Sequence, residues 1–149
     1  MNKPRILRDS PFSRIRPDKG SMTNVTKLEL ARDWLPRYTG MPIEEFGDYI
    51  LLTNFTNYLN RFAEKFGCEI QGEDRPMQST TNSAGLTMIN IGIGSPNAAT
   101  IMDLLIARQP KGVLFLGKCG GLKKSTEIGN FILPIAAIRG EGTSNDYLP

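Results

Sequence analysis

Histidine is absent from this sequence of 149 residues, and only two cysteines and one tryptophan occur in it. Without histidine the chain itself supplies no Ser–His–Asp triad and no His/Cys zinc site. The two cysteines, Cys68 and Cys119, form no Cys-x-x-Cys motif. A disulfide framework is not expected, and without a histidine to activate it Cys119 is not expected to act as a nucleophile. We therefore expect no metal site and no covalent cysteine catalysis.

Long apolar runs are also missing. The longest, residues 112–116 and 131–138, are far shorter than the ~20 residues needed to cross a bilayer. Residues 1–20 contain no apolar stretch of the kind that marks a secretory signal. The sequence therefore predicts a protein that does not span a membrane and that resides in the cytoplasm.

The composition is that of one ordinary globular domain, with 40% hydrophobic and 22% charged residues. The net charge of +3 is unevenly placed, because the first 20 residues carry +4 and the remaining 129 carry −1. We interpret residues 1–24 as a flexible basic leader and residues 25–149 as the folded part. A basic leader can also bind nucleic acid, in which case a salt-dependent affinity would disappear on its removal. We do not expect nucleic acid as the main partner.

Apolar spacing predicts alternating strands and helices in residues 25–149. Helices are predicted over residues 27–35, 55–66 and 97–108, and strands over residues 48–52, 86–91, 113–116 and 130–138. Pro36 is expected to end the first helix, Thr53 or Asn54 to cap the second, and Ser95 to cap the third. This alternation is typical of an α/β fold with a mostly parallel sheet.

Three loops follow the first three predicted strands and are the candidate ligand-binding loops, because ligands of such sheets bind at the carboxyl ends of the strands. They cover residues 53–57, 92–97 and 117–124. The second begins with Gly92-Ile93-Gly94, which invites a dinucleotide-binding interpretation. Asn97 stands where the third glycine of Gly-x-Gly-x-x-Gly would be, however, and no acidic residue ends the next strand. No cofactor is therefore expected, and the two glycines then serve a tight turn beside a ligand or another backbone segment.

The loop Gly117-Lys118-Cys119-Gly120-Gly121 carries the clearest signal. Three glycines in five residues let the backbone approach a ligand closely, and Lys118 adds a positive charge. The alternative is a flexible turn with an outward lysine. Cys119 by itself is more often a small buried apolar residue than a nucleophile. Residues 139–144 add a cation, a carboxylate and two hydroxyls, which suit either the polar wall of a site or a solvated loop.

Several of these segments, taken in order, resemble the nucleoside phosphorylase/uridine phosphorylase superfamily. The segments are residues 91–98, 116–122, 128–130 and 137–144. The versions with Gly-Lys-Cys-Gly-Gly and Arg-Gly-Glu-Gly-Thr-Ser-Asn-Asp-Tyr resemble the short bacterial AMP nucleosidases in particular, and the similarity covers roughly residues 31–149. The resemblance implies a three-layer α/β sandwich with a mixed, mostly parallel central sheet. It also implies cleavage of the N-glycosidic bond of a purine nucleotide or nucleoside and a homo-oligomer, commonly a hexamer.

Two departures from the phosphorylase pattern favour hydrolysis over phosphorolysis. Tyr58 stands where the resemblance leads us to expect a phosphate-binding arginine, and Phe115 or Leu116 stands where a second one is expected. Because phosphate recognition relies on bidentate arginine, losing both should weaken binding of free phosphate. Lys118 then either orients water or contacts the ribose phosphate of the substrate. The candidate substrate-binding residues are Gly94, Gly117, Lys118, Cys119, Gly120, Arg139, Glu141, Thr143 and Ser144.

The resemblance implies that the acid which protonates the departing base comes from positions beyond Pro149, so no catalytic residue is assigned within this sequence. We expect residues 1–149 to be the N-terminal part of an AMP nucleosidase-like enzyme that hydrolyses AMP to adenine and ribose 5-phosphate. Two alternatives stay open. One is a purine or uridine nucleoside phosphorylase, and the other is a nucleotide-binding module that lacks catalytic activity.

Overall fold

Four strands form one mixed sheet in the computed structural model, which describes residues 26–147. Their order across the sheet is β2 (Gln78–Thr81), β3 (Leu86–Asn90), β1 (Tyr49–Thr53) and β4 (Gly112–Leu116). β3, β1 and β4 are parallel, whereas β2 runs antiparallel to β3. The predicted mixed, mostly parallel sheet is confirmed, and it contains β2 in addition to the strands listed from the sequence.

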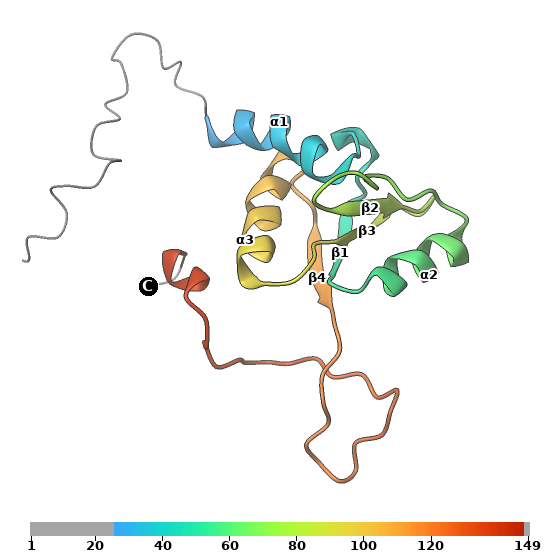
Figure 1. Cartoon of the computed structure of the whole chain (residues 1–149), viewed down its shortest axis with the longest axis vertical. Coiled ribbons are helices and arrows are strands. Elements are labelled where there is room, and N and C mark those ends of the chain that lie inside the picture. Colours follow the sequence, from blue (N-terminus) through green and yellow to red (C-terminus); the bar gives the residue numbers. More distant parts are fainter. Residues whose placement is uncertain (1–25, 148–149) are drawn as a thin grey trace, which may run out of the picture.

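Helices cover both faces of the sheet and complete three layers (Figure 1). Helices α1 (Lys27–Thr39) and α3 (Ser95–Leu104) lie on one face, and α2 (Thr56–Phe66) lies on the other. The short 3₁₀ helix η3 (Leu105–Ala107) continues α3, and a second one, η2 (Ile43–Glu45), precedes β1. This arrangement follows from the alternation of strands and helices along the chain.

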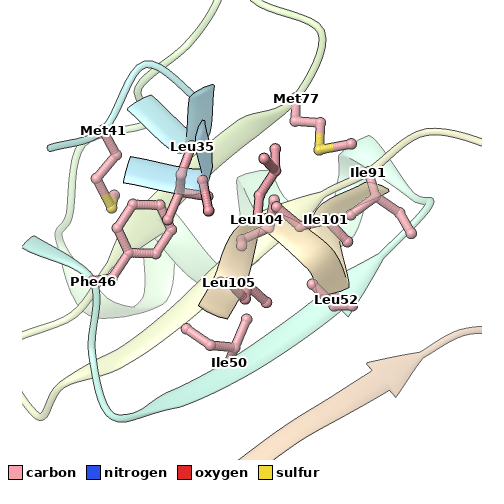
Figure 2. Close-up of a cluster of buried hydrophobic side chains, with 12 residues drawn as sticks. Leu35, Met41, Phe46, Ile50, Leu52, Met77, Ile91, Ile101, Leu104 and Leu105 are labelled. Atoms are coloured by element: carbon pink, nitrogen blue, oxygen red, sulfur yellow. The ribbon is translucent and has the colours of Figure 1, made fainter. Parts of the chain in front are cut away.

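The larger core lies between the sheet and the α1/α3 layer (Figure 2). Ile50 and Leu52 of β1 point to this face, where they pack with residues of both helices such as Leu35 and Ile101. The intervening Leu51 packs on the opposite face with Leu59 of α2. Alternate residues of β1 thus enter different cores, as the two-residue period of a strand requires.

Helix α1 continues past Pro36, so the prediction that proline ends it was wrong. The helix runs to Thr39 and ends at Gly40, which adopts a left-handed conformation with φ 72°. The amide of Gly40 donates to the carbonyl of Pro36 over 2.8 Å, and the Thr39 hydroxyl donates to the carbonyl of Leu35 over 2.8 Å. Leu35 and Thr39 are both fully buried one helical turn apart. Their burial outweighs the hydrogen bond that proline cannot donate.

The predicted starts of the other two helices were shifted. The N-cap of α2 is Phe55, which has no hydroxyl or carboxamide to cap the helix, and Thr53 belongs to β1. The N-cap of α3 is Gly94 with φ 111°, so Ser95 is the first helical residue and Pro96 lies in the first turn. The end of α2 at left-handed Gly67 is confirmed.

Residues 130–138 do not form the predicted strand. Within residues 117–147 the structure contains no strand, and the regular element is the 3₁₀ helix η4 (Thr143–Asp146). A strand needs a hydrogen-bonded neighbour, and the sheet ends at β4, which pairs only with β1 among the described strands. The apolar side chains of this segment, including Phe131, Leu133 and Ile135, are exposed.

Two sequence predictions concern the leader and the membrane. The leader predicted over residues 1–24 lies outside the described residues. Among residues 26–147, no helix has both the length and the apolar character needed to cross a bilayer.

Candidate active site

The carboxyl ends of the three parallel strands are level with one another. Thr53, the last residue of β1, pairs with Asn90 of β3 and with Leu116 of β4. The loops after β1 and β3 then lead to α2 and α3, on opposite faces of the sheet. In open parallel sheets, ligands bind where neighbouring strands send their loops to opposite faces. The three loops predicted from the sequence therefore start from one edge, which we call the strand-end edge.

A cavity of about 620 Å³ lies beside this edge, between the start of α2 and the loop after β4. Its lining consists of Tyr58, Phe115, Leu116, Gly117, Lys118, Cys119, Gly121, Thr126, Glu127, Ile128, Gly129, Asn130, Phe131 and Ile132. The glycine-rich loop forms one wall and the turn at residues 126–130 forms another. A Cβ atom at Gly121 would lie 2.5 Å from Cγ2 of Thr126, so the two walls approach this closely only with glycine.

Lys118 points at aromatic rings beside the cavity. Its Nζ lies 4.6 Å from the ring centroid of Phe55 and 5.4 Å from that of Tyr58. The two rings are tilted against each other with centroids 5.3 Å apart. Among the ion pairs of residues 26–147, none involves Lys118. Its positive charge therefore faces ring surfaces instead of a carboxylate.

Polar side chains connect the loops at the strand-end edge. The side-chain nitrogen of Asn90 donates to the Thr56 hydroxyl over 3.1 Å, and its side-chain oxygen accepts from the backbone amide of Gly92 over 3.2 Å. Asn90 thereby joins the loops after β1 and β3. Next to β1, the side-chain oxygen of Asn54 is buried and accepts no hydrogen bond from the described residues. Such acceptors are rare in folded proteins, where a bound water or ion commonly satisfies them.

A second polar group forms at the N-terminus of α3. The hydroxyls of Ser95 and Thr143 are hydrogen-bonded over 3.1 Å, and the amide of Ser144 donates to both carboxylate oxygens of Glu141 over 3.2 and 3.3 Å. The side chains of Ser144 and Ser95 lower the pKa of Glu141 to about 2, with further help from the amides of Ser144 and Thr143. The carboxylate is therefore charged at neutral pH. The hydrogen bond between Ser95 and Thr143 links η4 to α3.

Further along α3, Tyr147 and Lys27 both bind Asp103. The Tyr147 hydroxyl donates to Oδ2 over 2.9 Å, and Nζ of Lys27 lies 2.6 Å from Oδ1. The hydrogen bond from Lys27, followed by that from Tyr147, lowers the pKa of Asp103. Residues 141–147 are thus fixed to α3 at both of its ends.

A family comparison agrees with this architecture. The family model of the phosphorylase superfamily matches residues 39–149, which include the sheet, the cavity and the segment at α3. The chain belongs to the phosphorylase superfamily.

Individual relatives of this phosphorylase-superfamily chain include proteins named AMP nucleosidase and uridine phosphorylase. AMP nucleosidase of Escherichia coli K12 is 31% identical over 82% of the chain, which spans 32% of that protein. Uridine phosphorylase of Treponema pallidum is 26% identical over 75% of the chain and 45% of that protein. The crystal structure of AMP nucleosidase from Bacteroides thetaiotaomicron is 59% identical with a TM-score of 0.76, covering 83% of this chain and 52% of that one. The chain thus spans about a third to a half of the length of these relatives.

The residues predicted to bind substrate in this superfamily member fall into two groups. Gly117, Lys118 and Cys119 line the cavity, and Gly120 lies in the same loop. The others, Gly94, Arg139, Glu141, Thr143 and Ser144, do not line it. They lie at the start of α3 or in the segment that contacts it, where Nη1 of Arg139 donates to the side-chain oxygen of Asn145 over 2.8 Å. That either group binds substrate stays a prediction.

Phe55 lies in a loop predicted to bind ligand, and residues 128–130 carry part of the family resemblance. Neither Phe55 nor the wall at residues 126–132 was predicted as a site residue or site wall. The sequence did show that Tyr58 stands in place of an arginine expected from the phosphorylase pattern. Nothing in it indicated that the ring of Tyr58 faces a lysine 60 positions later. Cys119 is exposed, not a small buried apolar residue. Among residues 26–147, no cluster of three or more Cys, Asp or Glu side chains is arranged to hold a metal ion. Lys118 is therefore the cationic group available for binding a ligand within the cavity lining.

Proposed function

We propose that this chain supplies the strand-end cavity of an enzyme that hydrolyses the N-glycosidic bond of AMP, giving adenine and ribose 5-phosphate. The observation that carries the proposal is the position of Lys118. It projects from a glycine-rich loop into a cavity at the ends of parallel strands, where a phosphate monoester would find a positive charge. The similarity to two proteins named AMP nucleosidase supports the same assignment.

The cavity lining favours water over free phosphate as the attacking group. Tyr58, Phe115 and Leu116 all line it. The phosphorylase pattern leads us to expect one arginine at Tyr58 and a second at Phe115 or Leu116. Aromatic and aliphatic side chains offer a phosphate dianion no bidentate hydrogen bonds. We assign Lys118 to the phosphate of the substrate or to the attacking water, and Gly117, Cys119 and Gly120 to backbone contacts with it.

The group at α3 supports a second part of the proposal. Gly94, Arg139, Glu141, Thr143 and Ser144 would line the polar side of the complete site, next to the strand-end edge. We also propose that the protein acts in the cytoplasm. We further propose that it forms a homo-oligomer, because the exposed apolar side chains between residues 128 and 138 are suited to burial against further protein surface. Light scattering of the purified protein tests the oligomer.

A nucleotide panel tests the activity. The protein is incubated with AMP alone, with adenosine alone and with adenosine plus orthophosphate, and adenine and sugar phosphates are separated by chromatography. Adenine from AMP without added phosphate supports hydrolysis, whereas ribose 1-phosphate from adenosine plus phosphate supports a phosphorylase. Calorimetry on the same protein should show that it binds AMP. Failure to bind AMP would contradict the proposal.

A further inference from the structure

Two aromatic side chains of one helix start meet a lysine of another loop at the cavity. Phe55 is the N-cap of α2 and Tyr58 lies in its first turn, whereas Lys118 follows β4. Both ring centroids lie within 5.4 Å of Nζ. This is the distance range in which a cation is attracted to the electron-rich face of a ring. The contact joins the loops that follow the neighbouring strands β1 and β4.

A ring face holds an ammonium group in a different way than a carboxylate partner does. A carboxylate would neutralise the charge and occupy the N–H donors of Lys118, whereas a ring face attracts the charge and leaves those donors available for oxygen acceptors. Elsewhere in residues 26–147, Lys27 and Lys111 are each paired with an aspartate at 2.6 to 2.7 Å. Lys118 has no such partner within the described residues, and Glu127, the acidic residue of the cavity lining, makes no ion pair with it.

Holding the lysine in place has a further effect on binding. A lysine side chain is a flexible stem of four carbons joined by rotatable bonds, and the entropy lost when it is ordered on binding opposes association. A lysine already held against two rings loses less freedom when it meets an anion. The rings therefore act on the ligand through Lys118.

We propose that Phe55 and Tyr58 are positioning residues that hold Lys118 ready for the oxygens of a phosphate group. The inference rests on the proposed function and adds a specific role for the residue at position 58. Tyr58 stands in place of the arginine that the phosphorylase pattern leads us to expect. In this proposal its ring also orients Lys118. The phosphate belongs either to a nucleoside monophosphate or to free orthophosphate, and the experiment separates these sources.

The test compares ring-removing variants. Phe55→Leu and Tyr58→Leu, singly and together, remove ring faces while keeping apolar volume. Phe66→Leu is the matched control, because Phe66 is an exposed ring on the same helix with Lys65 Nζ 5.8 Å from its centroid, away from the cavity. Calorimetry gives the Kd of each variant for AMP, adenosine and orthophosphate. Circular dichroism and Tm show that each variant is folded.

We expect Lys118→Met to weaken AMP binding about ten- to a hundredfold, since a charged hydrogen bond is lost. The double leucine variant should weaken it about three- to tenfold, with adenosine binding unchanged. Tyr58→Phe, which keeps the ring, should weaken it less than Tyr58→Leu, and Phe66→Leu should not change it. Unaltered AMP binding in the double variant, or an equal loss for AMP and adenosine, would overturn the proposal. Orthophosphate binding as tight as that of AMP would assign the phosphate to a free ion.

A second measurement separates this inference from the proposed function. The methylene protons of Lys118 next to Nζ should show an upfield ring-current shift in the NMR spectrum of the ligand-free protein, and the double leucine variant should abolish it. If the unmodified protein does not bind AMP, the proposed function fails. The positioning role is then decided by this shift alone: its presence and loss in the variant support the role, and its absence in the unmodified protein refutes it.

Discussion

The body of the protein, residues 27–116, and the C-terminal segment, residues 117–147, both contain apolar side chains, but these lie in opposite environments. In the body, side chains such as Ile50 and Ile89 enter a core that two helices close. In the C-terminal segment, Leu122, Phe131 and Ile135 are exposed, and the segment crosses open space before it reaches α3 (Figure 1). The difference indicates that an apolar pattern produces a strand only where a neighbouring strand and a covering layer are present.

The largest expected effect separates the two regions by burial. Ile89→Ala should lower the free energy of unfolding by about 2 to 5 kcal/mol, because Ile89 has no exposed surface and its loss leaves a cavity. Leu122→Ala, at a fully exposed side chain outside residues 128–138, should change it by less than about 0.5 kcal/mol. Urea denaturation measures both. A comparable loss for the two variants would show that residue 122 is buried in solution and would remove the contrast.

Glycines provide the next contrast. Gly72 has φ +81°, and a Cβ atom there would lie 2.3 Å from the carbonyl oxygen of Thr39. Gly72→Ala should cost at least about 1 to 3 kcal/mol, the range for a non-glycine residue in this conformation, with the steric clash added. At Gly140 in the C-terminal segment a Cβ atom would meet nothing within 4 Å, so Gly140→Ala is the control and should leave stability unchanged. An equal response in urea denaturation would contradict the packing of residue 72 against α1.

Charged groups should show a smaller difference. Asp48 in the body accepts from Arg108 and contacts Lys111, each over 2.7 Å, and its pKa is lowered by the hydrogen bond from Lys111 and its charge, with Arg108 adding to the effect. These pairs therefore stabilise the fold above the ordinary pKa of 3.8, and the stabilisation is lost as the pH falls below it. Asp48→Asn should lower the Tm at pH 7, whereas Glu141→Gln should not. A Tm that falls equally in both would show that the C-terminal segment unfolds together with the body.

The accuracy of the sequence predictions follows the same division. In the body, the strand and helix positions were within a few residues of the structure, because each element buries apolar residues at its own period. The errors came where tertiary contacts override local signals. Burial of Leu35 and Thr39 carries α1 through Pro36, and the absence of a pairing partner within the described residues leaves residues 130–138 without a strand.

The candidate site was predictable in part for a related reason. The glycine-rich loop could be placed at the end of a strand from the sequence alone, because the apolar run at residues 113–116, directly before it, predicts that strand. The contact of Lys118 with Phe55 and Tyr58 joins positions about 60 residues apart, and no periodicity encodes it. The separation of Glu141 from Lys118 into two groups likewise depends on the path of residues 119–140, which local patterning did not determine.

The smallest expected effect is local and concerns the contact between residues 141–147 and α3. The folded pKa of Glu141, about 2, lies below its ordinary value of 4.5, so this carboxylate stabilises the docked segment above pH 4.5 and loses that effect as the pH falls toward 2. We expect the NMR amide shift of Ser144, whose N–H donates to Glu141, to titrate with a midpoint near 2 and to stop responding in Glu141→Gln. A midpoint near 4.5 in the unmodified protein would mean that the carboxylate is free in solution. The Ser144–Glu141 hydrogen bond would then be absent in solution, and the hydrogen bonds of Thr143 with Ser95 and of Tyr147 with Asp103 would be left as the links between this segment and α3.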